Sequence, residues 1–303
     1  MSKQKYALVT GSSSGIGYNV CIALSKRGYK VFGASLEHTL PLMDPLQKEW
    51  GVVPVACDIT NNEDIRKTVE YIKKETNGKL HLLYNNAGIA VGAPAIEQPA
   101  DDLEKVFRVN VFGHMYMTQY MSDLVIAAKG TIVFTSSIAA RVPLPWISAY
   151  CSTKAAIDQY ALVLHGEMEP FGVRVHSVIT GGVNTAIGDN SCNIDIGPSR
   201  YNVDGIIEST KASSGMTRDP RTHVSPESYA ENVVRCITRK RDPGFNIYQG
   251  GFSYIMHFVG RWFPLFLTEW ILQFQFKQLK VWRNIRKQVK AKDEAELRAK
   301  KLD

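Results

Sequence analysis

The chain has 303 residues, of which 45% are hydrophobic and 21% are charged, and its formal net charge is +7. This length and composition suit one large folded domain with an appendage, and they exclude a disordered or fibrous protein. Ten Lys or Arg and four Asp or Glu lie between Lys277 and Asp303, so this tail carries +6 of the charge and the rest of the chain +1. A nearly neutral body argues against a nucleic-acid-binding domain, which carries a basic face on the fold itself.

Cysteine usage points to a reducing compartment. The five cysteines are scattered, odd in number and free of any Cys-x-x-Cys pair, so we expect neither a disulfide framework nor a metal site. The N-terminus runs into a short apolar strand and lacks the hydrophobic core of a signal peptide. We therefore expect a cytosolic or cytosol-facing protein in which any membrane association comes from another part of the chain.

Short apolar runs alternate with helical stretches from residue 5 to about residue 250. This alternation is typical of a doubly wound parallel sheet, an α/β fold of the Rossmann type, and it predicts one such domain over residues 1–251. A helix is expected over residues 61–76, and another is expected to begin after Ser225 with Pro226 in its first turn. The expected strands cover residues 5–10, 30–34, 52–56, 80–84, 173–178 and 245–249.

A glycine-rich turn follows the first expected strand. Residues 10–17 read Thr-Gly-Ser-Ser-Ser-Gly-Ile-Gly and lead into helical residues that continue to about Arg27. Glycines permit a tight turn there, and free amides at the start of a helix bind the negative charge of a pyrophosphate. The sequence therefore predicts a dinucleotide site whose first contacts come from Gly11, Ser13, Gly15, Ile16 and Gly17.

The same turn also satisfies the Gly-x-Ser-x-Gly pattern of a lipase nucleophile, with Ser13 between Gly11 and Gly15. That chemistry needs a histidine base and an acid from later in the chain. His165 and His176 are present, but nothing in the sequence marks them as partners of Ser13. A triacylglycerol lipase is therefore kept as an alternative function.

The residues after the second expected strand determine whether such a site prefers NAD or NADP. An acidic side chain there accepts hydrogen bonds from the ribose 2′-hydroxyl, whereas a basic one accommodates a 2′-phosphate. Leu36 stands where an NAD enzyme has an aspartate, which favours NADP, but Glu37 counts against a phosphate and NAD is not excluded. Asp58, just after the third expected strand, can bond the adenine edge.

Tyr150 and Lys154 lie four residues apart, on one face of an expected helix, and Ser137 lies thirteen residues before the tyrosine. A phenol with a pKa of about 10 is a poor base near neutral pH, and a neighbouring ammonium group lowers that pKa. The three side chains are therefore candidates for proton transfer to or from an alcohol.

These motifs occur together in an order and spacing that resemble one family. The chain is similar to the short-chain dehydrogenase/reductase family over residues 5–250, in Thr10 to Gly17, Asn85 to Gly88, Asn110, Ser137 and Tyr150 to Lys154. The resemblance implies a Rossmann-type fold and hydride transfer with NADPH or NADP. The cofactor contacts that it implies are Asn86, Ala87, Gly88, Tyr150, Lys154, Val183 and Thr185.

The resemblance also implies catalytic roles. Tyr150 would donate the proton when a ketone is reduced, Ser137 would hydrogen-bond the substrate oxygen, and Lys154 would bind the nicotinamide ribose while acidifying the tyrosine. Asn110 would hold a helix kink and a water of the proton relay. Two hydroxyl donors and a nearby cation suit the negative charge that builds on the oxygen during hydride transfer.

One segment departs from the family pattern. Thr180 stands where the family usually has a proline, which we expect to loosen the turn before Val183 without threatening the reaction. The long stretch that follows, residues 186–225, is expected to cover the substrate.

Beyond Gly251 the family pattern ends. Residues 252–274 are rich in aromatic and aliphatic side chains but are interrupted by charges and by Pro264, so they do not suit a spanning helix. A basic run from Lys277 to Lys292 follows. Residues 252–303 are therefore predicted to form an amphipathic helical extension that lies on a membrane, the alternative being a helix packed over the cleft or onto a second subunit. The last four residues resemble a dilysine retrieval signal of the endoplasmic reticulum.

Several segments are most similar to the fungal members of the family that reduce 1-acyldihydroxyacetone phosphate. This likeness implies NADPH-dependent reduction of an acylated lipid ketone to 1-acylglycerol 3-phosphate, on the cytosolic face of the endoplasmic reticulum and on lipid droplets. A 17β-hydroxysteroid or retinol dehydrogenase is the alternative substrate class, and a catalytically inactive lipid-droplet coat protein is an alternative of another kind. The family also suggests a homo-oligomer.

Overall fold

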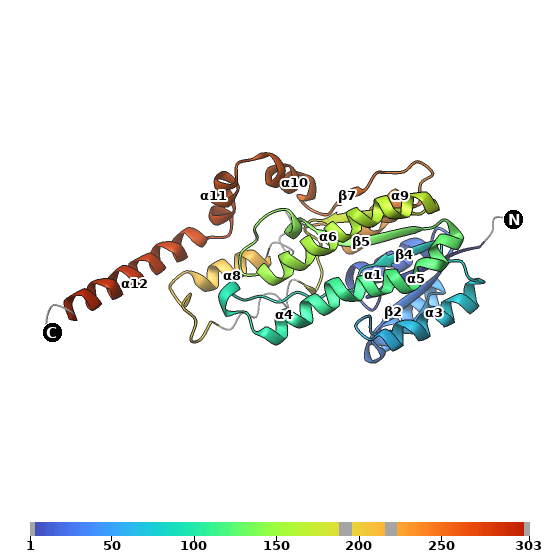
Figure 1. Ribbon diagram of the computed structural model, residues 1–303, viewed down its shortest axis with the longest axis horizontal. Helices are drawn as coiled ribbons and strands as arrows, with labels where there is room; N and C mark the ends of the chain where they lie inside the picture. The colour runs from blue at the N-terminus through green and yellow to red at the C-terminus, as the bar shows by residue number, and fades with distance from the viewer. Residues whose placement is uncertain (1–3, 188–195, 216–222, 300–303) are drawn as a thin grey trace.

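The computed structural model describes residues 4–187, 196–215 and 223–299. Its centre is a seven-stranded sheet in the order β3-β2-β1-β4-β5-β6-β7, and all neighbouring strands are parallel (Figure 1). The predicted doubly wound α/β fold is therefore confirmed. The strands are β1 (Lys5–Thr10), β2 (Tyr29–Ser35), β3 (Val53–Ala56), β4 (Leu82–Asn85), β5 (Thr131–Ser137), β6 (Arg174–Thr180) and β7 (Asn246–Gln249).

The strand order reverses between β1 and β4. From β1 the chain proceeds outward to β2 and β3, and it then returns to place β4 on the other side of β1. The connections leave opposite faces of the sheet at this point, so a crevice opens at the carboxyl ends of the strands, where ligands of such folds bind. The glycine-rich turn follows β1 and therefore lies at this crevice.

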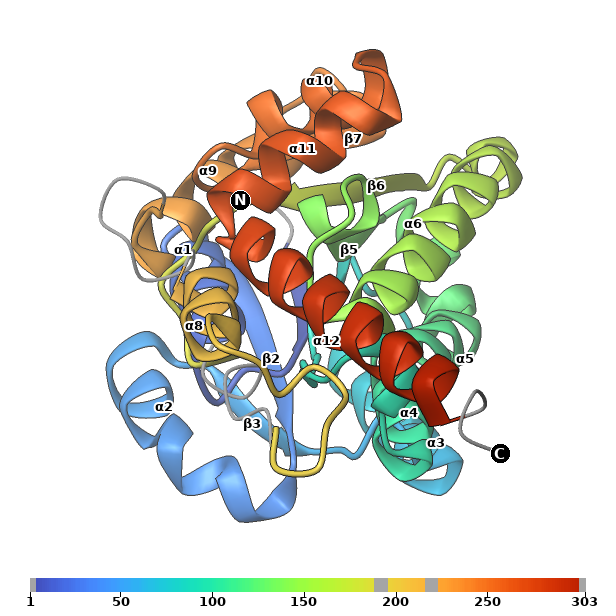
Figure 2. The same ribbon diagram turned by 90° about the vertical axis from the view of Figure 1, so that its left-hand side faces the viewer.

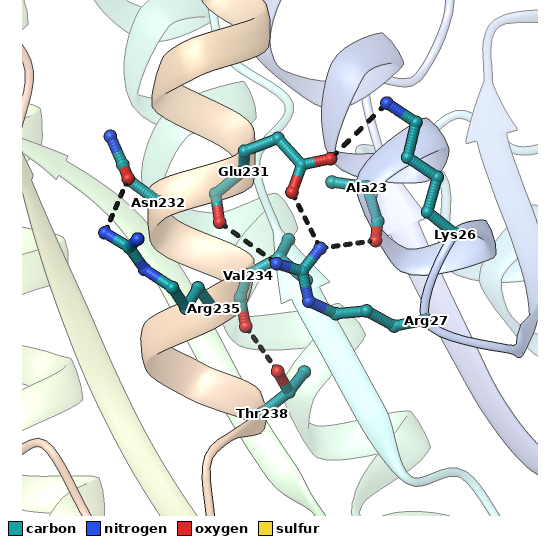
Figure 3. Close-up of polar contacts among 8 residues, drawn as sticks. All are labelled: Ala23, Lys26, Arg27, Glu231, Asn232, Val234, Arg235 and Thr238. Carbon is teal, nitrogen blue, oxygen red and sulfur yellow. Dashed lines mark hydrogen bonds and ion pairs between the residues drawn. The ribbon is translucent and has the colours of Figure 1, made fainter.

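One face of the sheet is covered by α1, α2 and α9. Their apolar side chains join Val9, Tyr84 and Val178 of the sheet in one core cluster. The guanidinium group of Arg27, just after α1, donates to Glu231 of α9 at 2.9 Å and fastens the two helices (Figure 3). The helices of this face are α1 (Gly15–Ser25), α2 (Asp44–Trp50) and α9 (Pro226–Thr238).

The opposite face is covered by α3, α5 and α6. Their buried side chains pack with Leu83 of β4 and Phe134 of β5 in a second core cluster. Between α4 and α5 the helix passes through one π-helical segment, called η3 (Arg108–Gly113). The helices are α3 (Asn62–Thr76), α4 (Ala100–Phe107), α5 (His114–Ala128) and α6 (Ser148–Met168).

The chain after β7 forms helices outside the two layers. Pro264 divides the aromatic stretch into two short helices, and α12 projects away from the body (Figure 1). Within the described residues, no helix has the length and apolar character that crossing a membrane requires. These helices are α10 (Ser253–Trp262), α11 (Leu265–Gln275) and α12 (Gln278–Ala299), whereas α8 (Ile206–Gly215) lies between β6 and α9 in the chain.

Element boundaries differ from the predicted ones by a residue or two. β4 begins at Leu82 rather than at residue 80, and β6 continues to Thr180 rather than ending at residue 178. Pairing with a neighbouring strand decides these ends, because Thr180 pairs with both Ser137 of β5 and Gln249 of β7. The expected cap of α9 is present, with the Ser225 hydroxyl accepting from the amide of Ser228.

Candidate functional site

A cleft of about 670 Å³ lies at the carboxyl ends of the strands. It brings together nearly all of the residues that the sequence singled out, although they come from six separate parts of the chain. Gly17 and Asn110 do not line it and lie behind its surface. The predicted residues that line the cleft are Gly11, Ser13, Gly15, Ile16, Asp58, Asn86, Ala87, Gly88, Ser137, Tyr150, Lys154, Val183 and Thr185.

The glycine-rich turn forms a cradle in which side chains at Gly11 and Gly17 would collide with neighbouring backbone atoms. A Cβ on Gly11, whose φ is +67°, would lie 2.8 Å from Cα of Ala87, and a Cβ on Gly17 would lie 2.2 Å from the carbonyl oxygen of Gly11. The side chain of Ser14, the residue before α1, makes no capping hydrogen bond. The first amides of α1 are thus left for an anion, which fits the pyrophosphate of a dinucleotide.

Asn86 braces the cradle from the neighbouring strand. Its Nδ2 donates to the carbonyl of Thr10 at 3.0 Å, and its Oδ1 accepts from the hydroxyl of Thr135 at 3.2 Å. The Thr10 hydroxyl in turn accepts from the amides of Asn86 and Ala87, at 2.9 and 3.1 Å. These bonds tie the ends of β1, β4 and β5 together, so Asn86 holds the shape of the cleft besides lining it.

Mixed charges surround the far end of the cleft, where β2 and β3 end. A smaller hollow of about 370 Å³ adjoins it, and both contain Leu36 and Asp58. The Asp58 carboxylate accepts from the amide and the hydroxyl of Thr60, both at 2.8 Å, which fixes its position. The polar and charged residues that line the smaller hollow are Glu37, His38, Asp58, Asp64 and Lys67. This mixture can accept bonds from a ribose hydroxyl and can also offer one cationic side chain, Lys67, to a phosphate.

The proposed catalytic side chains meet where α6 passes the end of β5. Lys154 is buried, its Nζ donates to the carbonyl of Thr135 at 2.8 Å, and it lies 5.6 Å from the centre of the Tyr150 ring. Burial lowers the pKa of Lys154 to about 8. Burial also raises the pKa of the Tyr150 phenol, and the adjacent Ser137 hydroxyl acts in the opposite direction.

This differs from the expectation that Lys154 lowers the pKa of the phenol. Desolvation of a buried phenolate outweighs the favourable contacts around it, so the pKa lies above its ordinary value. Tyr150 therefore holds its proton at neutral pH. A protonated phenol is the form that can act as an acid toward a carbonyl oxygen.

Asn110 lies in the π-helical segment, where the sequence placed a helix kink. Its Nδ2 donates to the carbonyl of Ile89 at 2.8 Å and to the hydroxyl of Thr153 at 3.1 Å, and its Oδ1 accepts from the Ile89 amide at 2.9 Å. The Thr153 hydroxyl donates to the carbonyl of Tyr150 at 2.7 Å. Asn110 thus joins the loop after β4 to the catalytic helix without reaching into the cleft.

Sequence reasoning missed His114. Its Nε2 lies 2.6 Å from the carbonyl oxygen of Ala87, so the ring supports the cofactor-side loop from behind. Burial, with a smaller effect of the Lys154 charge, lowers the pKa of His114 to about 3. The imidazole is therefore neutral and donates from Nε2. The signal that could have found it is its place one helical turn after Asn110.

The turn after β6 lies against the glycine cradle. Thr185 is adjacent to Gly15, since a Cβ on that glycine would lie 3.4 Å from Cγ2 of the threonine. Val183 pairs with Val224, the last residue but one before α9. Both of these predicted cofactor contacts are therefore on the cleft surface.

The remaining lining of the cleft combines apolar side chains with Ser and Thr hydroxyls and with two cations, Lys105 and Arg108. Apolar side chains come from the loop after β4, from the loop between β5 and α6, and from the start of the expected covering segment. Of that segment, residues 188–195 and 216–222 lie outside the described residues, while Ser213 of α8 lines the cleft. The apolar residues that these three segments add to the lining are Ile89, Ala90, Ile138, Ala139, Leu144, Ile147, Ala186 and Ile187.

Comparison with known proteins agrees with this geometry. The profile of the short chain dehydrogenase family matches residues 5–193, more than half of the chain. The chain belongs to the short-chain dehydrogenase family. The family predicted from the motifs is thus confirmed, and a member with its tyrosine, lysine and serine in one cleft is an oxidoreductase acting on alcohol or ketone groups.

Relatives and solved structures extend the comparison. A Saccharomyces cerevisiae protein named NADPH-dependent 1-acyldihydroxyacetone phosphate reductase is 39% identical over 295 residues, covering 96% of this chain and 97% of its own. A Schizosaccharomyces pombe protein of the same name is 38% identical over 188 residues, 62% of each chain. Short-chain dehydrogenase ptmH of Penicillium ochrochloron is 33% identical and covers 88% of this chain and 96% of its own.

The solved structures show the likeness of the fold. A short-chain dehydrogenase from Streptomyces avermitilis superposes with a TM-score of 0.70 at 21% identity, covering 92% of this chain and 98% of that one. One from Burkholderia cenocepacia in complex with NADP gives 0.67 at 24% identity, covering 86% and 94%.

Proposed function

We propose that the protein reduces the ketone of 1-acyldihydroxyacetone phosphate to 1-acylglycerol 3-phosphate with NADPH. The observation that carries the proposal is the set of Ser137, Tyr150 and Lys154 in a cleft whose lining also includes many apolar side chains and the two cations Lys105 and Arg108. Such a cleft suits a ketone that carries an acyl chain. The two yeast relatives are named for this reaction.

The side chains have separate tasks in this reaction. Bound NADPH supplies the hydride. Tyr150, protonated because burial raises its pKa, gives its proton to the carbonyl oxygen. Ser137 donates a hydrogen bond to the same oxygen, and the buried Lys154 ammonium stabilises the phenolate that forms. Fixed donors and a cation in a desolvated site stabilise developing negative charge more than water does.

NADPH is the proposed cofactor because Leu36 removes the acid that would bind a ribose 2′-hydroxyl, and because the relatives are named NADPH-dependent. The glycine cradle fits either dinucleotide. The test is the dissociation constant of each from quenching of tryptophan fluorescence, measured without substrate. Tighter binding of NADH than of NADPH would refute this part of the proposal.

The experiment that tests the activity is a cofactor-oxidation assay of the purified full-length protein. Acyldihydroxyacetone phosphate should be reduced with NADPH, and the Tyr150→Phe variant should bind NADPH but reduce the ketone at least about a hundredfold more slowly. Steroid and retinoid ketones form the second arm of the assay. Turnover of these with no turnover of the acyl ketone would favour a 17β-hydroxysteroid or retinol dehydrogenase, whose substrates an apolar cleft also admits.

The lipase alternative lacks a base in the part of the chain that is described. No histidine is among the described residues that line the cleft beside Ser13. His165 and His176 are occupied elsewhere, with their Nδ1 atoms 3.0 and 2.9 Å from the carbonyl oxygens of Val175 and Gly244. Ester cleavage that survives in a Ser13→Ala variant would dismiss this alternative entirely.

We also propose that the protein works on the cytosolic face of the endoplasmic reticulum and on lipid droplets. Support comes from large exposed aromatic side chains on α10 and α11, followed by the basic α12. Lipid droplets have a single phospholipid layer, so an attachment without a spanning helix suits both surfaces. Fluorescence microscopy of the tagged full-length chain tests this location, and a diffuse cytosolic distribution would contradict it.

A further inference from the structure

One face of the C-terminal helices packs against the substrate side of the cleft. We define the cleft wall as residues 138–147, the loop between β5 and α6. Leu272 of α11 and Phe276 just after it are buried against Ala139, Val142 and Leu144 of this wall. The wall residues that also line the cleft are Ile138, Ala139, Leu144 and Ile147. A shift of α11 would therefore displace the residues that line the cleft, because a close-packed wall transmits movement rather than absorbing it.

The covering helix α8 is fastened to the same helices. The Ser209 hydroxyl of α8 donates to the carbonyl of Phe276 at 2.7 Å and accepts from Nε1 of Trp146 in the cleft wall at 3.0 Å. The Trp146 ring packs 5.6 Å from the ring of Trp282 on α12. Hydrogen bonds among three buried residues, Trp146, Ser209 and Phe276, thus connect the cleft wall, the cover and the C-terminal helices.

A second attachment joins the loop before α8 to α12. Lys280 forms an ion pair with Asp204 at 2.9 Å, and Nδ2 of Asn284 donates to the Asp204 carbonyl at 2.9 Å. The aliphatic part of Lys280 also lies against Gly205. The start of α12 lies beside α8, and the rest of the helix projects toward the viewer in Figure 2. The cover of the cleft is therefore held from its outer side by α12.

Trp146 itself is held in an unusual backbone conformation. Its φ is +66°, in the left-handed region that a bulky side chain rarely adopts. Such a conformation costs about 1–2 kcal/mol and persists only where the surroundings maintain it. The surroundings here are Ser209, Tyr201 and Trp282, which belong to the cover and to α12.

The other face of α10 and α11 is open and mostly apolar, with the exposed charges Arg261 and Glu269 among its apolar side chains. We define the docking surface as the exposed large apolar side chains of these helices; Trp262 is 71% and Phe266 is 73% exposed. Contiguous exposed apolar side chains on this scale mark an interaction site. The remaining members are Tyr254, Ile255, Phe258, Phe263, Leu265, Trp270 and Phe274.

The charge of the neighbouring helix indicates what covers this surface. Before Asp293, α12 contains six exposed cations and no acid. Aromatic side chains beside a basic helix match the interface of a phospholipid layer with anionic headgroups. The exposed cations are Lys280, Arg283, Arg286, Lys287, Lys290 and Lys292.

We propose that docking of this surface on an anionic phospholipid layer orders the cover and wall of the cleft, so that the enzyme is activated at the lipid surface. The inference rests on the proposed lipid substrate, and it adds the partner and a regulation of the same site. One set of helices contacts lipid with one face and holds α8 and the cleft wall with the other. A contact that reduces the mobility of these helices therefore also reduces the mobility of α8 and of the cleft wall.

Vesicles test the proposal directly. The full-length protein is given a short-acyl dihydroxyacetone phosphate that stays in solution, so that vesicles change the enzyme and not the supply of substrate. Adding vesicles of phosphatidylcholine and phosphatidylserine should raise kcat/KM about 5-fold or more, the usual lower bound for coupling between two sites. Vesicles of phosphatidylcholine alone should act more weakly. An unchanged kcat/KM while the protein is bound to vesicles would overturn the proposal.

Two kinds of variant separate docking from coupling. Trp262→Glu with Phe266→Glu should abolish vesicle binding and activation and leave the activity in solution unchanged, whereas Leu42→Glu, on an exposed apolar site of the Rossmann domain, should change neither. Lys280→Ala should keep vesicle binding but lose most of the activation. Arg283→Ala also removes one positive charge from α12 but leaves the ion pair with Asp204 intact, so this variant should keep the activation by vesicles.

Hydrogen exchange gives a readout that does not depend on turnover. Vesicles should slow amide exchange in α8 of the native protein and of Arg283→Ala, but not of Lys280→Ala. If the soluble ketone is not reduced at all, the proposed substrate is wrong while this readout still decides the coupling. If vesicles slow amide exchange in α8 equally in Arg283→Ala and Lys280→Ala, the inference is overturned. It is also overturned if the docking surface forms a dimer in solution and binds no vesicles.

Discussion

The hydroxyl groups of Thr180 and Tyr229 lie 2.6 Å apart where β6 ends at the cleft. Tyr229 is fully buried on α9, and burial raises the pKa of its phenol, so the hydroxyl keeps its proton. Gly182 and Gly251 add two backbone hydrogen bonds, of 3.0 and 2.9 Å, to the same turn. The expectation that the missing proline loosens this turn is therefore wrong, because side-chain and backbone hydrogen bonds hold it.

Removing one member of the hydroxyl pair should destabilise the protein. Thr180→Val leaves the buried Tyr229 hydroxyl without this partner, which costs about 1–3 kcal/mol. Tyr229→Phe should cost less, because the half-buried Thr180 hydroxyl keeps its hydrogen bond to the carbonyl of Val178 at 3.3 Å. The double variant should cost less than the sum of the two, because no hydroxyl is then left unpaired. Urea unfolding of the three variants measures this. Strictly additive costs would show that the two hydroxyls do not depend on each other.

Replacing Lys154 with arginine should change the pH dependence of reduction. Burial lowers the pKa of Lys154 to about 8, so its cation is present at neutral pH and is lost as the pH rises through about 8. The rate of ketone reduction should then fall above about pH 8. Lys154→Arg keeps its charge to a higher pH, so the fall should move upward or disappear. The measurement is kcat at saturating substrate from about pH 6 to about pH 10. An identical fall in both proteins would assign it to another group.

His114 should make stability depend on pH on the acid side. Its pKa is about 3 in the folded protein, because burial opposes the charged form, and about 6.5 in the unfolded chain. The unfolded chain therefore takes up a proton first, and stability is full above about pH 6.5 and is lost as the pH falls toward 3. His114→Gln should show a smaller loss between about pH 7 and about pH 5. Urea unfolding at the two pH values decides this, and equal losses would be the contrary result.

Two glycines should respond oppositely to the same substitution. Gly17→Ala places a Cβ 2.2 Å from the Gly11 carbonyl oxygen, so we expect a cost of about 1–3 kcal/mol and weaker cofactor binding. Gly166→Ala lies on α6 with no other atom within 4 Å of the new Cβ, so helix propensity should stabilise it by up to about 1 kcal/mol. Thermal unfolding and a fluorescence titration with NADPH test both. Destabilisation by Gly166→Ala would contradict the open space found there.

Much of the site could be predicted because its chemistry is local. Tyr150 and Lys154 are one helical turn apart, and the glycine-rich turn joins one strand to one helix, so their geometry follows from short spacings. The phenol's pKa was predicted in the wrong direction. Its burial depends on helices and loops far along the chain, and spacing alone cannot report it.

In the C-terminal extension, too, some features could be predicted from the sequence and others depend on tertiary packing. Its aromatic and basic content predicted an amphipathic helical segment without a spanning helix, and the described residues contain none. The sequence offered lipid contact and packing over the cleft as alternatives. The structure shows that the cleft side is packed by Leu272 and Phe276 while other side chains of the same helices are exposed. Packing over the cleft and contact with lipid are compatible in one segment, because the two faces of a helix can make different contacts.

The sequence by itself determined the sheet, the dinucleotide turn, the catalytic set and the family, because periodicity and short spacings encode them. Only the tertiary structure decided what lies behind these residues: His114 under Ala87, Tyr229 beside Thr180, and α12 on the cover of the cleft. Each of these contacts joins residues whose separation in sequence carries no period, and packing of whole layers brings them together. Burial, and with it every shifted pKa of the site, arises only at that level.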